Sequence, residues 1–306
     1  MGRAKYTRGC PWGDERPRAP PGRGADARGA GPSRGPPRTP GRAAAATVPC
    51  GVFRAVAILP RMPEPAAAYF LSDAHLGADP REREAAREGR LHDFLTSLQG
   101  RAAALYIVGD LFDFWFEYRT AIPRRHFATL AALRQLRESG VAITYLNGNH
   151  DFWLGPFLKN ELGVRTHSGA LALELQGHRI WLHHGDGLVG GDLGYRMLKK
   201  VLRNRVSVAL YRLLHPDLGL PLAHRVSRWS RHSRAGRPLE GDRLWREIAA
   251  PRFREGFDTV MIGHFHHAWE RREGGRAFFM LGDWMESFTY VVLRDGAFTL
   301  ETWPPR

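Results

Sequence analysis

Five short apolar segments of this chain are each followed by a polar motif, and this repetition constrains the fold more than any other feature of the sequence. The motifs are Ser72-Asp73-Ala74-His75, Gly109-Asp110-Leu111-Phe112-Asp113, Gly148-Asn149-His150-Asp151, His183-His184-Gly185-Asp186 and Gly263-His264-Phe265-His266. Sites in open α/β sheets form outside the carboxyl ends of the strands. The five motifs therefore predict an α/β fold in which several strand ends build one site.

Apolar runs and amphipathic segments alternate from Ala66 onward. Period-two and buried runs predict strands at 67–71, 103–108, 141–146, 169–175, 178–183, 259–262, 277–281, 288–293 and 297–302. The helical period predicts helices over 81–98 and 124–138. Gln176-Gly177 and Arg294-Asp295-Gly296 are typical of hairpin turns.

Residues 1–61 differ in composition from the rest of the chain. They are rich in Arg, Pro, Gly and Ala without any period, which predicts disorder. They hold 12 Lys or Arg against 3 Asp or Glu, and so carry +9 of the total charge of +14. The remaining chain is only moderately basic, which argues against specific nucleic-acid binding.

Three interpretations of this tail are open: a basic arm for an anionic surface, a transit-like segment, and an over-extended gene start with Met62 as the first residue. We favour the last, because Met62 stands just before the first predicted strand. The expected organisation is a tail at 1–61 and one domain at 62–306.

Cysteine content and hydropathy indicate in which cellular compartment the protein is expected. The two cysteines, Cys10 and Cys50, lie outside the patterned part, so we expect neither a disulfide framework nor a zinc–thiolate site. This usage fits a reducing cytoplasm. The chain contains no run of about 20 apolar residues, so the sequence predicts no membrane-spanning helix.

Residues 188–250 interrupt the strand–helix alternation and predict a helical insertion. Large apolar residues recur there near helical spacing, and six basic residues interleave with them: Arg196, Lys199, Lys200, Arg203, Arg205 and Arg212. One interpretation is a basic, apolar cap that binds an amphiphile or a membrane surface. The other is an ordinary insertion with a solvated arginine face.

The motifs offer carboxylate oxygens, one amide oxygen and imidazole nitrogens, which suit Mn, Fe or Zn. An ionised carboxylate has two oxygens, so Asp110 can bridge two ions. Two such ions can clamp a phosphoryl group. The candidate ligands are Asp73, His75, Asp110, Asn149, His184, His264 and His266.

Three further residues of the motifs have candidate roles. His150 is placed to assist the leaving oxygen, with Asp151 holding its imidazole in the right tautomer. The alternative is that His150 only hydrogen-bonds a phosphate oxygen. Asp113 is expected to orient a ligand or a loop, or else to cap a helix.

The order of these motifs, D-x-H, GD-x-x-D, GNHD, H and GH-x-H, resembles the calcineurin-like metallophosphoesterases. The resemblance implies a four-layered α/β/β/α sandwich with a two-metal site at the strand ends. It assigns one ion to Asp73, His75, Asp110 and His266. It assigns the other to Asp110, Asn149, His184 and His264.

A narrower resemblance covers about residues 66–305. The segment 105–115, Asp151-Phe152, His184-Gly185-Asp186, Gly194-Tyr195 and 281–284 are similar to the UDP-2,3-diacylglucosamine hydrolases of lipid A synthesis. These enzymes release UMP and 2,3-diacylglucosamine 1-phosphate. The resemblance implies two Mn²⁺ ions, an acylated UDP-sugar as substrate, and an insertion that acts as a lid for acyl chains.

It also implies a cytoplasmic enzyme at the anionic inner-membrane surface of a Gram-negative bacterium. The implied contacts to sugar or phosphates, besides His150, are Asp192, Tyr195, Arg231 and Arg234. The sequence predicts no oligomeric state.

One position departs from this pattern. The best-known branch of these hydrolases has Arg after the Gly-Asn pair, where this chain has His150. Imidazole cannot copy the bidentate grip of a guanidinium on phosphate. Hydrolysis of other nucleotide or phospholipid phosphodiesters therefore stays open as an alternative, and a non-enzymatic metal-binding scaffold is a third hypothesis.

Overall fold

The computed structural model describes residues 67–189, 201–232 and 241–304. The predicted tail at 1–61 and Met62 lie outside this part of the chain. Within the described ranges, no helix combines the length and the apolar character that crossing a membrane requires.

The first sheet has six strands in the order β11-β10-β1-β2-β3-β4. Strands β1 to β4 run parallel, while β10 pairs antiparallel with both β1 and β11. Their bounds, in sheet order, are Ala297–Thr302, Thr289–Arg294, Ala67–Leu71, Ala102–Val108, Ala142–Leu146 and Arg165–His167.

The second sheet has five strands in the order β5-β6-β7-β9-β8. Strands β6, β7 and β9 run parallel, and an antiparallel strand closes each edge. Their bounds, in sheet order, are Leu171–Leu175, His178–His183, Thr259–Ile262, Arg276–Leu281 and Ala268–Glu273.

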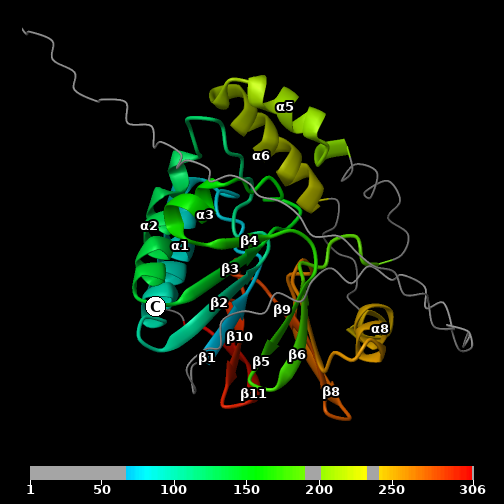
Figure 1. The fold of residues 1–306 in the computed structure, drawn as a ribbon. Helices are drawn as coiled ribbons and strands as arrows, with labels where there is room; N and C mark the ends of the chain where they lie inside the picture. The colour runs from blue at the N-terminus through cyan, green and yellow to red at the C-terminus, as the bar shows by residue number, and fades with distance from the viewer. Residues whose placement is uncertain (1–66, 190–200, 233–240, 305–306) are drawn as a thin grey trace, which may run out of the picture. The chain divides into compact units, whose positions relative to one another are not determined.

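The two sheets pack face to face and helices cover their outer faces (Figure 1). Helices α1 (Arg81–Ser97) and α2 (Phe127–Glu138) cover the first sheet. The second sheet is covered by α7 (Gly241–Leu244), the π-helical turn η2 (Trp245–Ala249) and α8 (Ala250–Arg254). The predicted four-layered α/β/β/α sandwich is confirmed.

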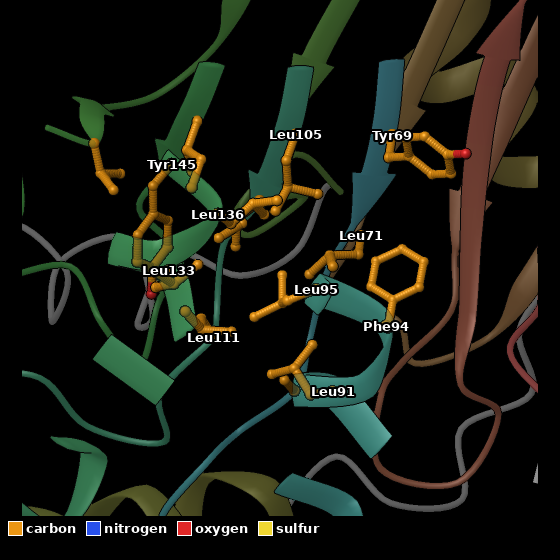
Figure 2. Packing of buried hydrophobic residues seen from close by; sticks show 14 of the residues in the cluster. Tyr69, Leu71, Leu91, Phe94, Leu95, Leu105, Leu111, Leu133, Leu136 and Tyr145 are labelled. Atoms are coloured by element: carbon orange, nitrogen blue, oxygen red, sulfur yellow. The ribbon is translucent and has the colours of Figure 1, made fainter. Parts of the chain in front are cut away.

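Strand β1 shows why the central strands are apolar throughout. Tyr69 and Leu71 pack against α1 and α2, whereas Ala68 and Phe70 face the second sheet. Successive side chains of a strand point to opposite faces, so a strand between two cores must be apolar at every position. Figure 2 shows Tyr69 and Leu71 beside Phe94 of α1 in the helix-side core.

Two longer helices, α5 (Arg205–Leu213) and α6 (Pro216–His232), lie in the region where a helical insertion is predicted. Figure 1 shows them together beyond one end of the strands, apart from α1, α2 and α8.

Most predicted elements are confirmed within two residues, but three elements were not predicted. These are α3 (Phe157–Leu162), β4 and β8. The helix predicted over 124–138 begins as the 3-10 turn η1 (Arg124–His126) before α2.

Candidate metal centre

All five motifs follow the carboxyl ends of strands that are central in the two sheets. Asp73, Asp110 and Asn149 come after β1, β2 and β3 of the first sheet. His184 and His264 come after β6 and β7 of the second. Because these strands run parallel within each sheet, the sandwich brings both sets of side chains to one edge.

One group of candidate ligands consists of Asp73, His75 and His266. Asp73 Oδ1 lies 3.6 Å from Nε2 of both histidines. The two Nε2 atoms lie 3.2 Å from each other. Three donor atoms that converge in this way could hold a metal ion.

A second group consists of Asp110, His184 and His264. His184 Nε2 lies 3.1 Å from Asp110 Oδ2 and 3.3 Å from His264 Nδ1. Asn149 Oδ1 is 3.1 Å from the same His184 nitrogen. The amide oxygen therefore lies beside this group, and its role as a metal ligand stays a prediction.

Asp110 connects the two groups. Its Oδ2 atom is 3.6 Å from His75 Nε2 in the first group and 3.1 Å from His184 Nε2 in the second. Its other oxygen, Oδ1, accepts a hydrogen bond from the His150 backbone N–H at 2.8 Å. This carboxylate is therefore fixed by the neighbouring loop between the two candidate positions.

The electrostatics of the site fit cations. Burial by itself raises the pKa of Asp73, but His184 and His266 lower it to about 2. Burial opposes the ionisation of Asp110 too, yet His184 and His150 hold its pKa well below the usual range. Burial lowers the pKa of His184, but Asp110 and Asp73 raise it to about 10.

Two buried carboxylates thus stay ionised and draw positive charge to their surroundings. Asp73 Oδ1 is buried and has no hydrogen-bond partner among the described residues. A buried acceptor of this kind needs a cationic or donating partner. The donor set and its charge therefore fit divalent metal ions.

Five of the candidate ligands have left-handed backbone conformations. The φ angles of Asp73, His75, Asp110, His264 and His266 are 56°, 44°, 52°, 73° and 53°. Such angles are uncommon for residues other than glycine and concentrate at functional sites. The turns after β1, β2 and β7 thereby aim these side chains into the site.

Glycines before three of the ligands let side chains from other strands pass close to the backbone. A Cβ atom on Gly109 would overlap the His184 ring, and one on Gly148 would overlap the Asp110 carboxylate. A Cβ on Gly263 would overlap Ser72 and the Asp73 carboxylate. The Gly-Asp, Gly-Asn and Gly-His pairs of the motifs thus have a steric cause.

His150 is buried beside the first group, but its neighbours differ from the one we expected. Its Nδ1 atom lies 2.7 Å from Ser227 Oγ and 3.5 Å from Asp113 Oδ1. The Asp151 carboxylate instead accepts from the Gly148 N–H at 2.7 Å and from the Tyr145 hydroxyl. The contacts thus place Ser227 and Asp113 beside the His150 ring. Asp151 instead hydrogen-bonds within its own loop, to the Gly148 N–H.

Asp113 lies beside three histidine rings, those of His75, His150 and His224. Its Oδ1 atom is 3.6 Å from His75 Nδ1, on the side of the ring away from the candidate metal position. A carboxylate there favours a proton on Nδ1 and leaves Nε2 to face a metal. This geometry agrees with an orienting role.

A sixth strand end contributes Asp283, to which we had assigned no role. Its Oδ1 accepts hydrogen bonds from three successive backbone N–H groups at 2.9–3.1 Å. Its Oδ2 lies 3.8 Å from His266 Nδ1. Asp283 follows β9, so the rule that located the five motifs also locates this residue.

The implied substrate contacts fall mostly outside the described ranges. Asp192, Tyr195 and Arg234 are not among the described residues, and of Arg231 only the backbone, in α6, is described.

A cavity of about 410 Å³ opens between α5 and the loops after β2 and β3. Its lining is largely aromatic and aliphatic, with two arginines. The lining residues are Phe116, Glu117, Tyr118, Arg119, Phe152, Trp153, Leu154, Gly155, Pro156, Val208 and Arg212.

Comparison with known proteins agrees with this geometry. A protein of Porphyromonas gingivalis named UDP-2,3-diacylglucosamine hydrolase is 32% identical over 76% of this chain and 96% of its own length. A protein of the same name from Stenotrophomonas maltophilia is 32% identical over 76% of this chain and 97% of its own length. Another from Neisseria meningitidis is 29% identical over 75% of this chain and 94% of its own length. The calcineurin-like phosphoesterase model matches residues 68–268. The chain therefore belongs to the calcineurin-like phosphoesterase family of metal-dependent hydrolases.

Proposed function

We propose that this protein hydrolyses the pyrophosphate of UDP-2,3-diacylglucosamine, releasing UMP and 2,3-diacylglucosamine 1-phosphate. The observation that carries the proposal is the pair of ligand groups joined by Asp110. The names of its relatives support this substrate within the family.

The proposed site holds two divalent ions, with Mn²⁺ as the expected metal. Asp73, His75, Asp110 and His266 would hold one, and Asp110, Asn149, His184 and His264 the other. When bound, such ions activate water and neutralise charge on phosphoryl oxygens. Oxygen and imidazole donors without thiolate suit Mn²⁺.

His150 would serve the phosphoryl group directly. Its Nδ1 atom is held by Ser227, so Nε2 is the ring atom left to face a substrate oxygen. With its other proton on Nδ1, the ring carries a proton on Nε2 only in its cationic form, and that form would donate a hydrogen bond to a phosphate oxygen or a proton to the leaving group. Asp151 supports this indirectly, since it keeps the 148–151 loop closed.

The cavity beneath α5 supports an acylated substrate. Apolar side chains such as Phe116, Trp153 and Val208 line it, and Arg212 stands at its border. Ligand sites combine this kind of apolar lining with few polar groups. We assign it to the acyl chains, with the insertion at 188–250 as the cap over the site.

Exposed apolar residues on α5 and α6 support the proposal that the protein acts at a membrane surface. Val206, Leu210 and Leu213 of α5 and Leu218 and Leu222 of α6 are all more than half exposed. Arg205 of α5 and Arg225 of α6 are exposed as well. We call these five apolar residues the cap surface, and propose that it rests on the anionic inner membrane of a Gram-negative bacterium from the cytoplasmic side.

The test is to incubate the purified protein with UDP-2,3-diacylglucosamine and Mn²⁺ and to measure UMP. We expect UMP release that a chelator stops and that Asp110→Ala abolishes together with metal binding. Absence of UMP overturns the proposal. Faster turnover of water-soluble phosphodiesters would favour the other phosphoesterase function, and biological function retained by Asp110→Ala would favour a scaffold.

A further inference from the structure

The cap helices are attached to the loops of the metal centre at several points. Tyr211 of α5 packs against Phe116 and Trp153 with ring centroids 4.6 and 4.9 Å apart. The Arg203 guanidinium donates to the Gly148 carbonyl oxygen at 2.9 Å. These contacts seat the insertion beside the site, and one further contact reaches the site itself.

That contact is made by Ser227 of α6. Its Oγ atom lies 2.7 Å from Asp113 Oδ1 and 2.7 Å from His150 Nδ1. All three residues are buried. An ionised carboxylate only accepts, whereas a hydroxyl donates once and also accepts. Ser227 therefore donates to Asp113 and is the nearer acceptor for the Nδ1–H of His150, which also lies 3.2 Å from the Asp113 backbone carbonyl oxygen.

The same carboxylate is shared with two more rings. Asp113 Oδ2 lies 3.3 Å from His224 Nδ1, one turn before Ser227 on α6. Asp113 Oδ1 is also 3.6 Å from Nδ1 of His75, a candidate metal ligand. A single buried carboxylate thus connects the cap helix, the His150 ring and the first ligand group.

We propose that Ser227 is a positioning residue: its hydroxyl fastens α6 to Asp113 and fixes the tautomer and direction of the His150 ring. Seating of the cap and orientation of His150 then become one event. This inference rests on the proposed phosphoester chemistry of the site, but not on the identity of the lipid substrate.

Threonine and valine have nearly the same shape and differ in the hydroxyl, so Ser227→Thr and Ser227→Val form a matched pair. The probe reaction is Mn²⁺-dependent hydrolysis of bis(p-nitrophenyl) phosphate, a soluble diester without acyl chains. We expect kcat of Ser227→Val to fall by about tenfold or more with little change in KM. Ser227→Thr should keep most of the activity of the unaltered protein.

A second readout does not need turnover. In protein with ¹⁵N-labelled histidine, the ring signal of His150, identified with a His150→Gln variant, should report a proton on Nδ1. Ser227→Val should shift this signal, because only the longer contact to the Asp113 carbonyl oxygen then remains for Nδ1, and Ser227→Thr should leave it unchanged. Ser207→Val on α5, away from Asp113, is the control and should change neither readout.

Equal behaviour of the Thr and Val variants in both measurements overturns the inference. So does a Val variant that changes only KM for the acylated nucleotide, because Ser227 would then merely shape the lipid site. Should the protein hydrolyse the soluble diester but not the acylated nucleotide, the proposed substrate fails while the Thr–Val comparison still decides the role of Ser227.

Discussion

Gly148 controls how close the β2 and β3 loops can approach at the centre of the site. A Cβ there would overlap the Asp110 carboxylate, which connects the two ligand groups. The obstacle is the carboxylate itself rather than a flexible surface side chain. Gly148 therefore matters for the position of Asp110 more than for its own conformation.

Gly148→Ala should weaken Mn²⁺ binding by at least about tenfold, because the added methyl displaces the shared carboxylate. Titration calorimetry with Mn²⁺ measures this directly. Gly100→Ala is the control: its φ is 70° and nothing lies near an added Cβ. That variant should lose about 1 kcal/mol of stability and bind Mn²⁺ normally. Normal binding by Gly148→Ala would contradict the steric argument.

His126 is a buried histidine away from the candidate ligands. It packs against Phe112 with ring centroids 4.5 Å apart, and its Nε2 has no hydrogen-bond partner among the described residues. Burial is the largest cause that lowers its pKa to about 3, with smaller contributions from Arg125 and His224. The folded protein therefore keeps this ring neutral where the unfolded chain protonates it.

The consequence is a loss of stability in acid. Below the unfolded pKa of 6.5 the unfolded state binds one more proton, so the free energy of unfolding falls by up to about 1.4 kcal/mol per pH unit. The loss continues down to about pH 3. His126→Phe should flatten this slope between pH 6.5 and 4.5 in urea unfolding, whatever its baseline stability. Parallel slopes of the two proteins would contradict the burial argument.

The candidate ligands could be located from the sequence because each lies within four residues of the end of an apolar strand, while metal binding by them stays a prediction. The partners of His150 could not, since Ser227 and Asp113 are brought to it from α6 and from the loop after β2. Asp151 was the natural expectation as its neighbour in sequence. Its carboxylate instead turns back to the Gly148 N–H, as Asp often does in turns.

At the scale of elements, the central strands and the edge strands β5 and β11 were predictable, whereas the edge strands β4 and β8 were not. Strand β1 is buried at all five positions, so it forms a continuous apolar run. The edge strands β4 (Arg-Thr-His) and β8 (Ala-Trp-Glu-Arg-Arg-Glu) are polar and half-exposed. Edge strands need only one covered face, and charged residues on them discourage pairing with other chains, so their sequences carry little strand signal.

The seating of α5 depends on Tyr211, whose ring contacts Phe114, Phe116 and Trp153. Tyr211→Ala should shift the cap toward an undocked state by about 3 kcal/mol, because three aromatic contacts are lost. Limited proteolysis should then cut within residues 201–232 much faster, while the sandwich resists. Leu213→Ala, which removes a side chain that is 82% exposed, is the control. Equal cleavage rates for both variants would show that these ring contacts do not hold the helix.

At the scale of the whole molecule, the cap surface and the candidate metal centre belong to one region. The helices that expose Leu210 and Leu213 to solvent also contribute Val208 to the cavity and Ser227 to the site. A lipid substrate drawn from a membrane beneath the cap surface would therefore travel only a short way to the loops. If the cap surface rests on a membrane as proposed, membrane contact becomes part of substrate capture.

Leu210→Asp with Leu213→Asp should weaken binding to phosphatidylglycerol vesicles by about a hundredfold, because two large side chains lose apolar burial and gain charge. Co-sedimentation with vesicles measures it. Binding should also fall at high salt and on pure phosphatidylcholine. Phe127→Asp removes a side chain that is 75% exposed on α2 and should leave binding unchanged. Vesicle binding that survives the double substitution would place the membrane contact elsewhere.

The left-handed turns that carry five of the candidate ligands reduce the stability of the fold. His264 has a φ of 73°, which costs a histidine roughly 1 kcal/mol or more and suits asparagine better. In metal-free protein, His264→Asn should melt at the same or a higher temperature while losing Mn²⁺ binding, and a clearly lower melting temperature would refute this. Selection for thermal robustness alone would erode these ligands one by one. Their presence in the chain is therefore a record of selection for chemistry.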